Sequence, residues 1–219
     1  MKAAIVEFPG SFSVAEVETF CQQLGVDSLR VWFDEEKLPD VDFVILPSGD
    51  SFADYIRPGA LAARTKAAGA IKAFARAGGN VIGIGNGFQT LCELGLLPGM
   101  LLQNNDCLFK NTSVHLLNEG NENFFFGQLE KDLTVQVPFT GKYGSFYANK
   151  RTIQDIEEQK LVLFRYVDQF STIDEENPFV GSLSSIAALR NATGNVVGFM
   201  PRIDRADLQV LNLLKSGLK

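Results

Sequence analysis

The chain has 219 residues, of which 46% are apolar and 21% are charged, a composition typical of a globular protein with a sizeable core. This composition excludes a disordered tail, a collagen-like rod and a disulfide-rich miniprotein. Twenty Lys and Arg against 26 Asp and Glu give a net charge of −6, so no basic footprint exists for a phosphate backbone and we expect no nucleic-acid partner.

The chain carries no signal for a membrane or an oxidising compartment. Its longest apolar runs, such as Phe43–Pro47, are far shorter than the roughly 20 residues of a membrane-spanning helix, and Met1 leads directly into a strand-like segment. Cys21, Cys92 and Cys107 have no metal-like spacing and leave one thiol unpaired. We therefore expect a cytoplasmic protein without membrane contact, metal or cofactor.

Short apolar runs alternate with helical patterns through the first hundred residues. Runs that are apolar on both faces predict parallel strands covered by helices. In chain order the expected elements are a strand at Ala3–Phe8, a helix at Val14–Leu24, strands at Ser28–Phe33 and Phe43–Pro47, a helix at Leu61–Ala77 and a strand at Val81–Ile84. This alternation predicts a doubly wound α/β layer.

The second half of the chain has shorter strands with polar punctuation. Between about Leu108 and Tyr147 this pattern predicts antiparallel strands packed on or beside the main sheet. The later expected elements are a helix at Ile153–Gln159, a strand at Leu161–Tyr166, a hairpin of Ile186–Arg190 with Val196–Met200, and a helix at Ala206–Leu214. Without a repeat or a linker, residues 1–219 are expected to form one α/β domain with a mostly parallel sheet and an added antiparallel section.

The most informative segment is a Gly-x-Gly-x-Gly turn that follows the strand at Val81–Ile84. In nucleophile-elbow enzymes the flanking glycines, here Gly83 and Gly87, allow a sharp strand-to-helix turn that exposes a central Ser or Cys. The central residue here is Gly85, which offers no nucleophile. A phosphate-binding glycine loop is the alternative, but the third glycine of G-x-G-x-x-G is missing and such a loop normally follows the first strand.

Several motifs resemble one family in order and spacing. They are Glu7–Ser11, Leu46–Gly49 with Asp54–Ala60, Gly83–Gln89 with Leu94–Gly99, Asn177–Pro178 with Gly181–Leu183, Gly194–Gly198, and Met200–Pro201. Through these motifs the chain resembles the class I glutamine amidotransferase subunit of phosphoribosylformylglycinamidine synthase, the PurQ family. The resemblance extends from the first strand to about Ala206.

The resemblance implies a glutaminase that passes ammonia to a separate, ATP-using synthetase subunit. Such chemistry needs a Cys thiolate, a His that moves protons and a carboxylate that orients the His. The matching positions in this sequence are Gly85, Arg202 and Asp204. Glycine has no side chain, and an Arg guanidinium stays protonated and accepts no proton. No competent catalytic group therefore remains at these positions.

A second departure from the family lies in Pro138–Gly144. The family has a His-Gly-Glu-Gly run here, and an ungapped match places its His on Gly141 and its Glu on Tyr143. Two separate parts of the expected pocket thus lack their polar side chains, which a single engineered change would not produce. We infer natural decay or repurposing of the glutaminase site.

No other residue is expected to replace the missing pair. Cys92 lies two helical turns beyond Gly85, roughly 10 Å along the axis and too deep for a bound amide, and His115 belongs to an alternating strand pattern. Cys107 follows the elbow helix, and Cys21 lies on the first helix, away from the strand ends.

The expected oxyanion hole depends on backbone N–H groups and is therefore less affected by these changes. The resemblance places it at the loop of Gly49 and at the N–H of Asn86, so a glutamine-like small molecule remains a candidate ligand.

Three hypotheses follow. The first is a non-catalytic protein that serves as a structural or regulatory partner of the synthetase subunit, with Phe124–Phe126 as a candidate docking surface or else ordinary core. The second is an active glutaminase with a rearranged nucleophile. The third is a small-molecule-binding module in which Arg202 enters the old pocket and pairs with an acidic ligand, or with Asp204 or another internal carboxylate.

Overall fold

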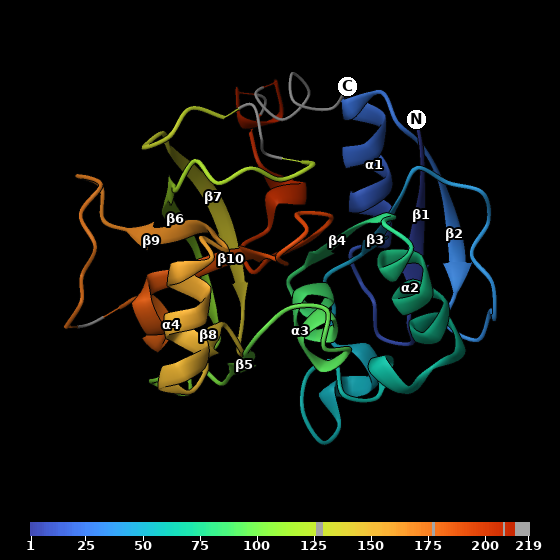
Figure 1. The fold of residues 1–219 in the computed structure, drawn as a ribbon, viewed down its shortest axis with the longest axis horizontal. Helices are drawn as coiled ribbons and strands as arrows, with labels where there is room; N and C mark the ends of the chain where they lie inside the picture. The colour runs from blue at the N-terminus through green and yellow to red at the C-terminus, as the bar shows by residue number, and fades with distance from the viewer. Residues whose placement is uncertain (126–128, 177, 208, 213–219) are drawn as a thin grey trace.

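The computed structural model describes residues 1–125, 129–176, 178–207 and 209–212. Its main sheet has nine strands in the order β2-β1-β3-β4-β11-β10-β9-β6-β7 (Figure 1). These strands are β1 (Lys2–Glu7), β2 (Asp27–Trp32), β3 (Phe43–Leu46), β4 (Asn80–Ile84), β6 (Lys110–Asn118), β7 (Thr134–Gly141), β9 (Val162–Val167), β10 (Ile186–Arg190) and β11 (Val196–Phe199). A separate antiparallel pair joins β5 (Met100–Leu102) to β8 (Ser145–Tyr147).

The sheet changes from parallel to antiparallel pairing at β11. From β2 to β11 every neighbouring pair is parallel, and from β11 to β7 every pair is antiparallel. The predicted hairpin of β10 and β11 causes the change, because a short turn forces its two strands to run in opposite directions. The predicted α/β class is confirmed, and the antiparallel strands extend the main sheet instead of packing on it.

The helices are α1 (Val14–Leu24), α2 (Lys66–Arg76), α3 (Asn86–Glu93) and α4 (Lys150–Glu158). In Figure 1, α1 and α2 lie by the parallel strands and α4 by the antiparallel ones. The single helix predicted over Leu61–Ala77 is wrong, because the chain breaks at Thr65 after a short 3-10 turn at Ala62–Arg64. The Thr65 hydroxyl accepts a hydrogen bond from the Ala68 N–H at 3.2 Å and starts α2 afresh.

The core covers both faces of the parallel strands, and all residues of β3 are buried. Phe125 is 1% exposed in this core and Phe124 packs against it, so these two do not form the docking surface considered from the sequence. Phe126 lies outside the described residues. Of the helix predicted at Ala206–Leu214, residues 209–212 are helical, while residues 208, 213 and 214 lie outside the described part. Among the described helices, none has the length and apolarity needed to cross a membrane.

Candidate functional site

The turn between β4 and α3 has the sharp geometry that its glycines predict. Gly85 has φ 55° and ψ −112°, a conformation that residues with a Cβ rarely adopt. A Cβ on Gly87 would lie 2.1 Å from the Leu46 carbonyl oxygen, and one on Gly83 would lie 2.6 Å from the Gly87 carbonyl carbon. The strand, turn and helix can pack this closely only because side chains are absent at these positions.

The space beside Gly85 is filled by Ser48, which follows β3. A Cβ added to Gly85 would lie 2.4 Å from Ser48 Oγ and 3.0 Å from Ser48 Cβ. Ser48 is only 4% exposed, and its Oγ makes no hydrogen bond to any described residue. The sequence pattern indicated a role only for the backbone of this loop, so the serine side chain beside the centre of the elbow was missed.

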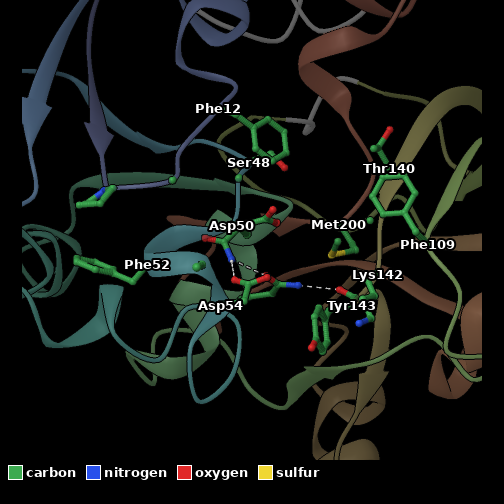
Figure 2. A pocket seen from close by; sticks show the side chains of 17 residues that line it. Phe12, Ser48, Asp50, Phe52, Asp54, Phe109, Thr140, Lys142, Tyr143 and Met200 are labelled. Carbon is green, nitrogen blue, oxygen red and sulfur yellow. Dashed lines mark hydrogen bonds between the residues drawn. The ribbon is translucent and has the colours of Figure 1, made fainter.

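A cavity of about 830 Å³ lies next to the elbow, at the carboxyl ends of β3 and β4 (Figure 2). Its lining residues are Pro9, Gly10, Phe12, Ser48, Gly49, Asp50, Phe52, Ala53, Asp54, Asn86, Gln89, Phe109, Thr140, Gly141, Lys142, Tyr143 and Met200. The cavity thus brings together Gly49, Asn86, Gly141 and Tyr143, as predicted. Gly85, Arg202 and Asp204 are not among its lining residues.

A hydrogen-bonded polar network connects the loops around the cavity. Asn86 Nδ2 donates to Asp54 Oδ1 at 3.0 Å and to Gln89 Oε1 at 2.8 Å. Gln89 Nε2 donates in turn to the Tyr143 carbonyl at 2.7 Å. Asp54 and Gln89 belong to the family motifs, but no role was predicted for their side chains. Gln89 could have been found, because it lies one helical turn after Asn86 and so shares its face of α3.

The Asp54 carboxyl at the wall of the cavity has an altered pKa. Burial raises the pKa of Asp54, the nearby Asp50 carboxylate raises it further, and the hydrogen bond from Asn86 opposes both; the resulting pKa is about 7. The Lys142 ammonium lies 5.9 Å from the centre of the Tyr143 ring. In the described part of the chain, Lys142 pairs with no carboxylate.

Arg202 lies outside the cavity in a charged cluster against α1. Its guanidinium is fully buried and donates to both Asp204 carboxylate oxygens, at 2.8 and 2.6 Å, and to Glu16. Arg205 donates to the same Glu16 carboxylate at 2.6 Å. The expectation that Arg202 meets an acidic ligand in the pocket is therefore wrong, whereas the alternative of internal carboxylate partners is what the structure contains.

The electrostatics of this cluster favour its charged form. Burial would lower the pKa of Arg202, but hydrogen bonds to Asp204 and Glu16, together with the attraction of their charges, hold the pKa above its ordinary value. Burial would likewise raise the pKa of Glu16, but hydrogen bonds from Arg205 and Arg202 leave the pKa below its ordinary value. Arg202 is thus a cation held in place by carboxylates and cannot serve as a base.

The remaining cysteines and the histidine lie away from the cavity. Cys92 is half-buried on α3 with its Sγ 3.7 Å from the Pro98 carbonyl, and burial raises the pKa of this thiol. Burial also raises the pKa of Cys21 in the core to about 12. Cys107 is exposed in a loop, and His115 lies on β6 opposite Gln136. Across the described residues, no group of three or more Cys, His, Asp or Glu could hold a metal.

The sheet order, the glycine elbow and the cavity above it define a protein of the glutamine amidotransferase class. The model of the CobB/CobQ-like glutamine amidotransferase domain matches residues 1–214. The chain belongs to this family, and within it the chain is PurQ-like.

Two relatives support this membership, and one more distant structure supports the fold. The phosphoribosylformylglycinamidine synthase subunit PurQ of Aquifex aeolicus is 42% identical over 212 residues, covering 96% of this chain and 93% of the relative. The structure of PurLQS from Thermotoga maritima matches with a TM-score of 0.85 and 33% identity over 99% of this chain and 96% of that chain. A glutamine amidotransferase from T. maritima matches with a TM-score of 0.59 at 12% identity over 97% of this chain and 80% of that chain, and it supports the fold alone.

Proposed function

We propose that this chain, as one domain over residues 1–219, is a subunit of phosphoribosylformylglycinamidine synthase in purine biosynthesis that does not hydrolyse glutamine. The names of its relatives support the first part, because the A. aeolicus relative is such a subunit and the T. maritima structure is the PurLQS assembly. The chain then acts as a structural or regulatory partner of a synthetase subunit, which draws on free ammonia or another donor.

The observation that carries the proposal is the composition of the elbow. Amide hydrolysis by this class needs a side chain at the centre of the turn that attacks the carbonyl carbon. Gly85 has none, and Ser48 fills the space where such a side chain would begin. Arg202, at the position of the expected base, is a buried cation paired with Asp204 and Glu16.

The opposite wall of the cavity supports the same proposal. Gly141 has no side chain to donate or accept a proton, and Tyr143 takes part in the polar network through its backbone carbonyl. The backbone N–H groups proposed for the oxyanion hole, those of Gly49 and Asn86, belong to residues that line the cavity. In this proposal a carbonyl compound is able to bind there but is not attacked.

A glutaminase with a rearranged nucleophile is the second candidate, and Ser48 is the observation that favours it. Its hydroxyl lies beside the elbow, and it shares the cavity with Asp54, whose pKa of about 7 suits a general base. This candidate requires glutamate production that depends on Ser48.

The two candidates are separated by a comparison of nitrogen donors. The purified chain is mixed with its synthetase partner, and amidine and glutamate are measured with glutamine or with ammonium chloride as donor. We expect amidine from ammonium chloride only and no glutamate above the level of synthetase alone, with the A. aeolicus PurQ relative as the active control. Glutamate release that disappears in Ser48→Ala would establish the second candidate instead. Failure of the chain to co-purify with the synthetase would contradict the proposed partnership.

A further inference from the structure

We propose that the cavity beside the elbow binds an organic cation, a primary amine carried on an apolar body, in preference to glutamine. This inference rests on the proposed function in one respect: it assumes that the cavity does not hydrolyse glutamine.

The charges of the cavity favour a cation. Its acidic and basic side chains are Asp50, Asp54 and Lys142. Figure 2 shows the two Asp side chains on one side of the cavity, with Lys142 and Tyr143 facing them from the other. The Asp50 carboxylate has no described partner, and only one oxygen of Asp54 accepts a described hydrogen bond. The Asp50 carboxylate contributes to the raised pKa of Asp54, and a cation bound beside the two carboxylates would reduce the repulsion between them.

Ser48 provides a second, independent observation that points to a polar ligand group. Only 4% of the residue is exposed, and it lines the same cavity. Its Oγ has no hydrogen-bond partner among the described residues. A ligand donor in the cavity would give this hydroxyl the hydrogen-bond partner that enclosed hydroxyls normally have. An ammonium group has three donors and no acceptor, and the cavity wall that carries Ser48, Asp50 and Asp54 offers it acceptors.

The apolar part of the cavity suits the body of such a ligand. Phe12, Phe109, Tyr143 and Met200 line it with aromatic and thioether surface, and Phe12 and Phe109 are more than half exposed. Aromatic faces attract cations and also accept apolar groups. The volume of about 830 Å³ is within the range of small-molecule sites, so the amine needs a body larger than a simple ammonium ion.

The positive end of α3 at the elbow does not reverse the preference of the cavity for a cation. The N-terminus of a helix carries about half a positive charge, which favours a ligand carbonyl at the N–H of Asn86. Glutamine and glutamate carry an ammonium group too, but their α-carboxylate would lie in the same cavity as the carboxyl groups of Asp50 and Asp54, which disfavour it. Lys142 offsets these charges only weakly, because it is exposed and lies over Tyr143.

The test compares three probes that differ only in their polar end: 4-phenylbutylamine, 4-phenylbutanol and 4-phenylbutanoate. Each is titrated calorimetrically into the full chain at pH 8, with glutamine as a fourth ligand. We expect the amine to bind about tenfold or more tightly than the alcohol, since hydrogen bonds to charged groups exceed neutral ones by this order. We expect the carboxylate and glutamine to bind more weakly than the alcohol.

Variants locate the bound amine. Asp54→Asn, which keeps an acceptor for Asn86, should weaken amine binding about tenfold. Asp50→Asn should weaken it severalfold, because Asp50 is exposed and its charge is screened by solvent. Ser48→Ala should weaken it as well, while Asp155→Asn on α4, a matched surface carboxylate, should leave it unchanged. Thermal melts confirm that each variant is folded.

Equal binding of amine and alcohol, tighter binding of glutamine, no binding of any probe, or no effect of Asp50→Asn and Asp54→Asn would overturn the inference. Glutamate release would instead overturn the proposed function, and the probe preference would still be measurable.

Discussion

Replacement of Arg202 by Met tests whether this residue acts as a structural cation. The side chain of Arg202 is fully buried, and so is the Asp204 carboxylate that it holds. Methionine fills a similar length without charge or donors, so the Asp204 carboxylate would be left buried with no cation. Glu16 is 40% exposed at its side chain and keeps Arg205, so its contribution to the loss is smaller.

The size of the expected loss in the free energy of unfolding follows from the burial of the ion pair and from one unpaired nitrogen of Arg202. Removing one partner of a buried ion pair costs about 3–5 kcal/mol. Arg202 Nη1 is buried without a described partner. Removing this unsatisfied donor stabilises the folded state by about 1 kcal/mol and so reduces the net loss. The expected loss is therefore about 2–4 kcal/mol in the free energy of unfolding. For a chain of this size that corresponds to a fall of about 4–16 °C in Tm.

The assay is thermal and urea unfolding at pH 7, with Arg30→Met as the matched control. Arg30 is 50% exposed at its side chain and pairs with Glu18 at 2.7 Å, so its loss should lower the free energy of unfolding far less than the loss of Arg202. Arg202→Met combined with Asp204→Leu should recover more than half of the single variant's loss, because it removes the uncompensated carboxylate. Equal losses for Arg202→Met and Arg30→Met would refute the reasoning.

Three further predictions concern the elbow, the cavity and the thiols. Gly85→Cys should lower the free energy of unfolding by about 1–3 kcal/mol, because φ 55° strains a residue with a Cβ and Ser48 crowds it. In denaturant titrations, adding Ser48→Gly should relieve part of that loss. The triple variant that also carries Arg202→His should still release little glutamate from glutamine. A rescue by these three changes alone would show that Gly141 and Tyr143 matter less than proposed. The Asp54 pKa of about 7 exceeds the ordinary 3.8, so folding is most favoured while Asp54 is protonated, and the free energy of unfolding falls as pH rises from about 4 to about 7. The gain in Tm from Asp54→Asn should therefore be larger at pH 8 than at pH 4.5. A gain that does not depend on pH would contradict the raised pKa. Iodoacetamide should modify exposed Cys107 at least about tenfold faster than buried Cys21 in the native chain, as read by peptide mass spectrometry; comparable rates would contradict the burial of Cys21.

The strands were predictable where both faces are buried. β1, β3 and β4 begin and end within one residue of their predicted bounds, because continuous apolar runs bordered by polar or glycine residues are a local signal. The break at Thr65 was also local, since a threonine before a helical run is a capping signal that the periodicity alone obscured. The continuous pairing of β9 with β6 and β10 was not predictable, because it depends on partners far apart in the chain.

Some residues of the cavity wall were predictable from the resemblance, but the geometry of the site was not. The resemblance located Gly85 and Arg202, and the cavity contains the expected Gly49 and Asn86. The direction of Arg202 could not be inferred, because Glu16 lies 186 positions away in the chain. The position of Ser48 beside the elbow likewise depends on how closely β3 packs against β4, which no local pattern encodes.

The most direct test of the central claim uses an electrophilic glutamine analogue, a diazoketone that traps nucleophiles of glutaminase sites. The chain, in complex with its synthetase partner, is incubated with the analogue and its intact mass is measured beside the A. aeolicus PurQ relative. We predict a single adduct on the relative and none on this chain. An adduct on this chain that maps to Ser48 or to any other residue lining the cavity would contradict the loss of the nucleophile.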